Sequence, residues 1–71
     1  MKNLWKGIFS YRSEMEVQYA HAYSKAQAKV MMLRRLAKKH DVSYQTVFGM
    51  FDGSKPNYQI IIETEFKEVT E

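Results

Sequence analysis

The sequence predicts an α+β domain in which one long and one short helix pack on one face of a three-stranded antiparallel sheet. Segments near both ends of the chain alternate apolar and polar side chains with the two-residue period of half-buried strands. The middle of the chain repeats apolar residues every three or four positions, which is the period of a helix. The expected order is β-β-α-α-β, for which a sheet with helices on one face is the simplest two-layer arrangement.

Two strands are expected over residues 4–12 and 15–23. One face of the first strand gathers three aromatic side chains, those of Trp5, Phe9 and Tyr11. In the second strand five residues alternate with smaller or polar ones: Met15, Val17, Tyr19, His21 and Tyr23. The polar pair Ser13-Glu14 separates the strands, which should therefore form a hairpin. This link lacks the Asn-Gly or Asp-Gly pair of tight hairpin turns, so the register stays open.

The long helix is expected to begin at Ser24, because Ser24 and Gln27 have the spacing of a capping box, and to end near residues 39–40. Its inner face should be an apolar stripe made by Ala26, Val30, Leu33, Leu36, Ala37 and His40. A short helix should follow over residues 44–51, with Ser43 as its N-cap. The alternative is a strand over residues 46–51, since Thr, Val and Phe favour strands and Gly49 costs a helix roughly 1 kcal/mol.

Residues 52–57 are dense in turn-forming residues, which predicts a loop. A third strand is expected over residues 58–66, with one buried face made by Tyr58, Ile60, Ile62, Thr64 and Phe66. Glu63 and Glu65 lie on the other face of this strand. Two neighbouring carboxylates can serve acid–base chemistry or hold a divalent ion, and on an edge strand they also discourage pairing with another sheet.

The length of 71 residues leaves no room for a second core, so the chain is expected to be a single domain over residues 1–71. The absence of cysteine removes disulfides and thiolate metal sites and predicts a reducing, cytoplasmic setting. No stretch approaches the roughly 18 apolar residues of a membrane span, so no membrane contact is expected. The net charge is +3, with a basic segment over residues 25–39 and four glutamates in the last nine residues. This charge distribution suits an acidic partner.

The residues predict a binding protein and not an enzyme. Neither histidine belongs to a recognisable catalytic motif: His21 is expected to pack at the margin of the sheet, and His40 to interact favourably with the dipole at a helix C-terminus. Two isolated histidines do not make a zinc site, and three scattered glycines do not make a phosphate-binding loop. No catalytic residue, metal or cofactor is therefore expected.

Four cations should share the face of the long helix opposite its apolar stripe: Arg34, Arg35, Lys38 and Lys39. Met31 is expected to lie among them, exposed to solvent. This arrangement has two interpretations. It is either an ordinary solvated helix face or a contact surface, in which the methionine supplies flexible apolar area and the guanidinium groups bind phosphates or carboxylates.

Residues 33–50 have the spacing of a helix-turn-helix, with a small residue at Ala37 and Asp41 at the turn position where glycine is usual. Within it, Val42-Ser43-Tyr44-Gln45-Thr46-Val47 resembles the start of the recognition helix in the lac repressor family. The resemblance implies contacts with duplex DNA, to base edges from Tyr44 and Gln45 and to phosphates from Ser43 and Thr46. The chain departs from that family directly afterwards, where Phe48 and Gly49 replace a serine and an arginine.

The whole pattern is also similar to small accessory proteins encoded by bacteriophages. It combines a strand hairpin, the segment Ala-Tyr-Ser-Lys-Ala-Gln-Ala at the start of a basic helix, and an acidic last strand. Many such proteins inhibit host nucleoprotein machines, anti-CRISPR proteins among them. Two functions therefore stay open. The first is binding of nucleic acid through the basic helix and the helix-turn-helix-like segment. The second is inhibition of a host or viral nucleoprotein assembly through Met31 and its basic ring, alone or together with the aromatic residues of the hairpin. Repressor-like DNA reading would require a homodimer, whereas an inhibitor can act as a monomer.

Overall fold

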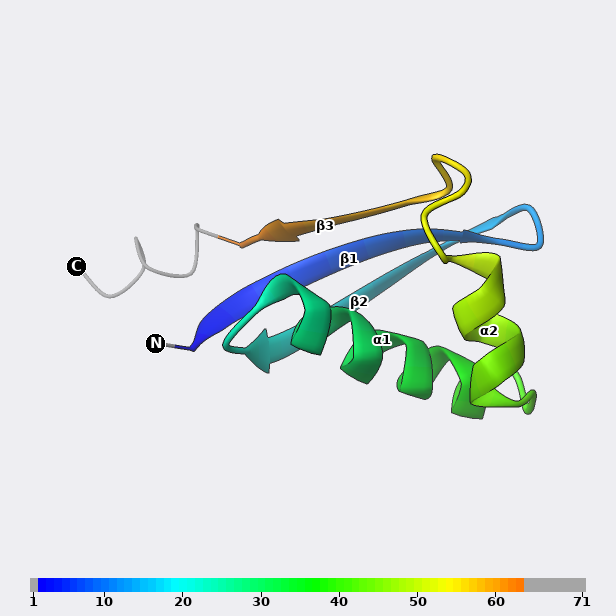
Figure 1. Cartoon of the computed structure of the whole chain (residues 1–71), viewed down its shortest axis with the longest axis horizontal. Coiled ribbons are helices and arrows are strands. Elements are labelled where there is room, and N and C mark those ends of the chain that lie inside the picture. Colours follow the sequence, from blue (N-terminus) through cyan, green and yellow to red (C-terminus); the bar gives the residue numbers. More distant parts are fainter. Residues whose placement is uncertain (1, 64–71) are drawn as a thin grey trace.

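The computed structural model describes residues 2–63, which form a three-stranded sheet and two helices (Figure 1). The elements follow one another as β1 (Asn3–Tyr11), β2 (Glu14–Ala22), α1 (Lys25–Lys39), α2 (Tyr44–Met50) and β3 (Tyr58–Ile62). The strand order is β2-β1-β3, and β1 pairs antiparallel with both neighbours. The predicted α+β class and the order β-β-α-α-β are confirmed. No helix within residues 2–63 has the length and apolar character needed to cross a membrane.

The hairpin between β1 and β2 turns one residue earlier than predicted. Tyr11 pairs with Glu14, so the turn consists of Arg12 and Ser13. Both turn residues have positive φ angles, of 49° and 69°. A turn with two left-handed residues matches the twist of the strands and usually contains Asn-Gly or Asp-Gly. Because neither residue is a glycine or an asparagine, the sequence carries no signal for this turn.

One face of the sheet forms the core together with the helices. β1 contributes the fully buried Phe9 and the almost fully buried Tyr11, and β2 contributes the small Ala20 and Ala22. The larger residues of the β2 alternation therefore lie on the opposite face. The small residues are inside because α1 packs against this part of the sheet, where bulky side chains on β2 would hold the helix away.

Gly7 in the middle of β1 allows the closest approach of α1 to the sheet. A Cβ atom at this position would lie 2.4 Å from the sulfur of Met32 and 2.8 Å from a ring carbon of Phe9. Both distances are shorter than any ordinary carbon contact. Glycine is required here because the side chain of Met32 occupies the space that a Cβ would need.

Both predicted ends of α1 are confirmed. Ser24 is the N-cap, and its Oγ accepts a hydrogen bond of 3.2 Å from the backbone N–H of Gln27. The Gln27 side chain accepts a bond from the N–H of Tyr23, one residue before the position used in a capping box. At the other end, Asp41 has a φ of 55°, and Val42 N–H donates to the carbonyl of Ala37, which is a Schellman closure.

The inner face of α1 differs from the predicted stripe. Its buried residues are Ala28, Met32, Leu33, Leu36 and Ala37. Leu33, Leu36 and Ala37 were predicted correctly, but Ala26 is exposed and Val30 is only half-buried. The helix is rotated so that Met32 lies over Gly7. Met31 follows this rotation: it is half-buried and packs against the core, so the prediction of a solvent-exposed methionine was wrong.

α2 has the predicted helical conformation, so the strand alternative is excluded. Val47 and the following Phe51 are fully buried and attach the short helix to the core. β3 is shorter than predicted within the described chain, and residues 64–66 of the predicted strand lie outside the described residues. Ile60 is buried as expected, but Ile62 is 41% exposed although its register places it on the helix-bearing face.

Candidate interaction surfaces

Lys39 and His40 share a partner within the protein, Glu16, at the junction of α1 and β2. Lys39 Nζ lies 2.8 Å and His40 Nε2 3.2 Å from the two carboxylate oxygens of Glu16, whose side chain is 8% exposed. The His40 ring also stacks on Tyr11, with centroids 4.2 Å apart. The hydrogen bond from Lys39 lowers the pKa of Glu16 below its usual value, and this effect outweighs the opposite effect of burial. Lys39 and His40 therefore hold the C-terminal end of α1 to the sheet.

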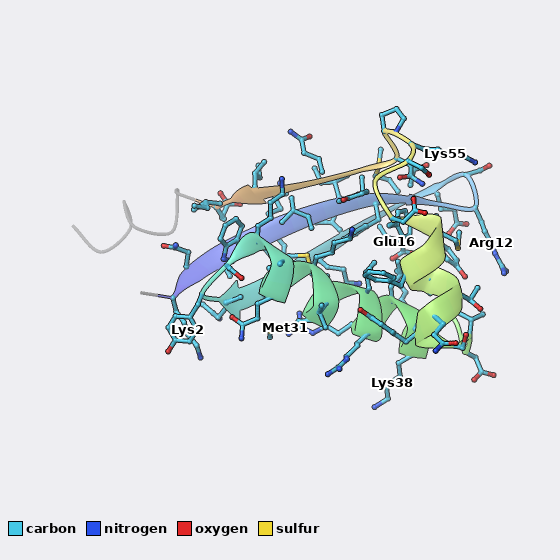
Figure 2. All side chains as sticks on the ribbon, in the orientation of Figure 1. Lys2, Arg12, Glu16, Met31, Lys38 and Lys55 are labelled. Atoms are coloured by element: carbon cyan, nitrogen blue, oxygen red, sulfur yellow. The ribbon has the colours of Figure 1, made fainter. Side chains whose placement is uncertain are left out.

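The two arginines of α1 also have partners within the protein. Arg35 Nη1 donates a hydrogen bond to the backbone carbonyl of Tyr19 on β2. The guanidinium of Arg34 lies 5.8 Å from the centre of the Tyr44 ring on α2. Lys38 instead points away from the sheet into solvent (Figure 2). The predicted basic face is thus exposed, but its residues point in three directions, toward β2, toward α2 and outward.

The helix-turn-helix-like segment uses most of its predicted contact residues to build α2. Ser43 is the N-cap: its Oγ accepts a hydrogen bond from Thr46 N–H at 3.2 Å and lies 2.8 Å from the Thr46 hydroxyl. Tyr44 is half-buried and stacks on Phe48, with ring centroids 5.6 Å apart. Gln45 is exposed. The second helix therefore exists, but the tyrosine does not project freely from it.

The sheet face opposite the helices, called the uncovered face below, is rich in apolar side chains. Four of them are exposed by large fractions: Met15 by 70%, Val17 by 47%, Tyr19 by 45% and Ile61 by 42%. The register places Lys6 of β1 between Tyr19 and Ile61. The strand residues of this face comprise Leu4, Lys6, Ile8, Ser10, Met15, Val17, Tyr19, His21, Gln59 and Ile61. They include one lysine and no carboxylate.

A hollow of about 330 Å³ lies at one end of the uncovered face. Ile8 and Ser10 of β1 and Met15 of β2 line it together with residues 56–59. Met15 is the most exposed of the large apolar residues named above, so the hollow continues the apolar surface toward the edge of the sheet.

The sequence prediction missed this surface, although a signal for it was present. Leu4 and Ile8 are apolar residues on the face of β1 opposite its aromatic residues, and Met15, Val17 and Tyr19 of β2 alternate with polar or small residues. A strand that carries apolar residues on both faces indicates contacts on both sides.

The chain is thus a small α+β domain with helices on one face of its sheet and an apolar surface on the other. No protein-family model matches the sequence, and no curated protein and no solved structure is significantly similar to it. Among residues 2–63, the structure brings no three histidine, aspartate or glutamate side chains together in a group that could hold a metal ion. The surfaces themselves therefore have to indicate the function.

Proposed function

We propose that the protein is a non-catalytic binding domain that attaches to another protein through the uncovered face of its sheet. An antiparallel sheet with helices on one side normally presents polar side chains to water on the other side. Here Met15, Val17, Tyr19 and Ile61 occupy that side and are each more than 40% exposed. This apolar face is the observation that carries the proposal, because contiguous exposed apolar surface is typical of interaction sites.

The chemistry of the uncovered face favours a protein over a nucleic acid. Aliphatic and methionine side chains provide apolar contact area but no phosphate contacts. Binding to a nucleic acid depends on many cations, and the strand residues of this face include only Lys6. We expect a partner with an apolar patch and an acidic group opposite Lys6. Inhibition of a host or phage nucleoprotein complex, as by small phage-encoded inhibitors, is one form that such binding would take.

A double variant of two exposed residues tests the proposal. Met15→Gln/Val17→Thr removes apolar area without touching the core, so the fold should stay intact. Wild-type protein immobilised on a resin should retain a specific protein from a cell lysate. The double variant should not retain that protein. Lys38→Gln is the matched control on the helix side and should retain it. Equal retention of the same protein by all three chains would argue against the uncovered face.

Nucleic-acid binding is the second candidate, supported by the outward-pointing Lys38 beside the exposed Arg34. Fluorescence anisotropy of a labelled random duplex, at low and at physiological salt, tests this function. Binding that falls steeply with salt and is lost in Arg34→Ala/Lys38→Ala would support it. Arg35 and Lys39 should be left unchanged, because both have structural partners. Absence of binding at low salt would contradict this candidate.

A further inference from the structure

We infer that two copies of this chain join edge to edge through β3 and form one continuous sheet. Each copy has three strands, so the joined sheet has six. The inference goes beyond the proposed function because it rests on the edges of the sheet and not on its uncovered face. The two edge strands, β2 and β3, differ in what occupies their outer backbone groups.

A side chain of α1 occupies part of the outer edge of β2. The two-residue turn after Tyr11 fixes which β2 residues bond to β1, and Tyr19 is among those whose backbone groups point outward. Its carbonyl already accepts a hydrogen bond from Arg35. Lys39 reaches the same strand through Glu16, and Figure 1 shows α1 running along β2. A second chain could pair with β2 at Tyr19 only by displacing the bond from Arg35.

Within the described part of the chain, the backbone groups on the outer edge of β3 have no hydrogen-bond partner. At its two ends, Asn57 accepts a bond from Ser10 and Glu63 donates one to Leu4, so the odd-numbered residues of this segment face β1. The direction alternates along a strand, and the N–H and C=O groups of Tyr58, Ile60 and Ile62 therefore point outward. Protein edge strands usually carry charges or a proline that prevent pairing, and residues 58–62 contain neither.

A twofold axis that is perpendicular to the sheet and passes between the Ile60 residues of the two copies satisfies all of these outward groups. Ile60 then pairs with Ile60 of the second copy, and Tyr58 pairs with Ile62 of the second copy. A shift of two residues toward the loop would place Ile62 opposite Pro56, which has no N–H to donate. No like charges face each other in the preferred register, because residues 58–62 are uncharged.

The same register covers an exposed apolar side chain. Ile62 is 41% exposed on the helix-bearing face, at the end of β3. The Tyr58 ring of the second copy would lie beside it. On the other side of the sheet, Ile61 would lie beside Gln59 of the second copy. The uncovered faces of the two copies then become one continuous surface, and both pairs of helices lie on the same side.

Sedimentation equilibrium of the full chain tests the inference. A contact of one short strand is small, so we expect a dimer with a dissociation constant on the order of 10 µM. Lys29 Nζ lies 3.0 Å from the Tyr58 hydroxyl, so Ile62→Lys would bring a second cation beside Lys29 of the second copy. This like-charge repulsion should weaken the dimer by about tenfold or more. Val17→Lys is the matched control, because it makes the same change at a similarly exposed residue of the other edge strand. It should leave the dimer intact.

Amide hydrogen exchange gives a second readout that does not depend on variants. Exchange at Tyr58, Ile60 and Ile62 should slow as the protein concentration rises, while exchange at the internally bonded Gln59 and Ile61 should not. A wild-type chain that stays monomeric, or a dimer lost in Val17→Lys and kept in Ile62→Lys, would overturn the inference. If both variants lose the dimer, the wild-type exchange rates decide: an unchanged rate at Tyr58, Ile60 and Ile62 as the protein concentration rises would overturn the inference. Val17→Lys should disturb only the partner contact proposed above, so the two proposals can fail separately.

Discussion

Glu16 is the buried charged residue on which the junction of α1 and β2 depends. We expect Glu16→Gln to lower the free energy of unfolding by about 1–3 kcal/mol at neutral pH, because Lys39 and His40 lose their charged acceptor. The exposed Glu14 on the same strand supplies the control variant Glu14→Gln, which should change the stability little. Urea unfolding of the three proteins measures both effects.

The pH dependence of this contribution follows from the pKa of Glu16, which is lower in the folded protein than the usual 4.5. The unfolded chain binds the proton more readily, so the stabilisation is present above 4.5 and is lost as the pH falls through the folded value. The difference between wild type and Glu16→Gln should therefore shrink at pH values well below 4.5. A difference that stays constant with pH would contradict the assigned role of the carboxylate.

Gly7 and Met32 form the tightest contact between sheet and helix. Gly7→Ala should destabilise the protein by about 1–3 kcal/mol, because the new Cβ would lie 2.4 Å from the Met32 sulfur. Met32→Ala leaves a cavity and should cost about 2–5 kcal/mol, but the two costs should not add, since the smaller side chain makes room for the Cβ. Thermal and urea unfolding of the single and double variants measure the coupling.

Gly49 provides the control for this cycle. A Cβ at Gly49 would meet no atom within 4 Å, and the residue lies inside α2. Gly49→Ala should therefore stabilise the protein by about 0.5–1 kcal/mol, the opposite sign to Gly7→Ala. Additive costs for Gly7→Ala and Met32→Ala would mean that the two residues do not compete for the same space.

At the scale of the elements, Arg35 protects the edge of β2. Arg35→Ala removes the side chain that bonds to the Tyr19 carbonyl and should leave both edges of the sheet available for pairing. If β3 pairs as inferred, chains with two free sheet edges can each bind two neighbours and form open-ended polymers. Light scattering should then rise with time and protein concentration. Lys38→Ala removes a charge of the same sign from the same helix and should behave like the wild type. Scattering that rises equally in both variants would point to loss of charge as the cause.

The sequence predicted the elements where local chemistry determines them. Ser24 and Ser43 cap the helices as expected, and the loop over residues 52–57 follows from its composition. The hairpin turn was misplaced because Arg12 and Ser13 take up left-handed conformations without a residue type that indicates them. The rotation of α1 was missed because it depends on the fit of Met32 to Gly7, two residues that are distant in the sequence.

The candidate surfaces were predicted less well, for the same reason. The four cations predicted on the outer face of α1 are exposed as expected. The contacts Arg35–Tyr19 and Lys39–Glu16 join residues 16 and 23 positions apart. Helical periodicity gives the direction of a side chain from its own helix and no information about the strand beside it. The uncovered face arises because both helices pack on the other side of the sheet, which is a property of the assembled layers.

At the scale of the whole molecule, a variant of Lys6 distinguishes a specific contact with a protein partner from a general attraction by the positive net charge. Lys6 lies at the centre of the uncovered face, whereas Lys25 is exposed at the start of α1. Lys6→Glu and Lys25→Glu each change the net charge by −2, from +3 to +1. If an acidic group of a protein partner faces Lys6, Lys6→Glu should weaken binding about tenfold or more while Lys25→Glu leaves it nearly unchanged.

If the wild type retains a protein from a cell lysate, the measurement is the affinity of each variant for that protein at two salt concentrations. Lys25→Glu places a negative charge at a helix N-terminus and should not harm the fold, so it is a fair comparison. Equal losses in both variants, removed by salt, would mean that the excess positive charge of the chain attracts the partner. A loss confined to Lys6→Glu would mean that the partner lies on the uncovered face, with its acidic group between Tyr19 and Ile61.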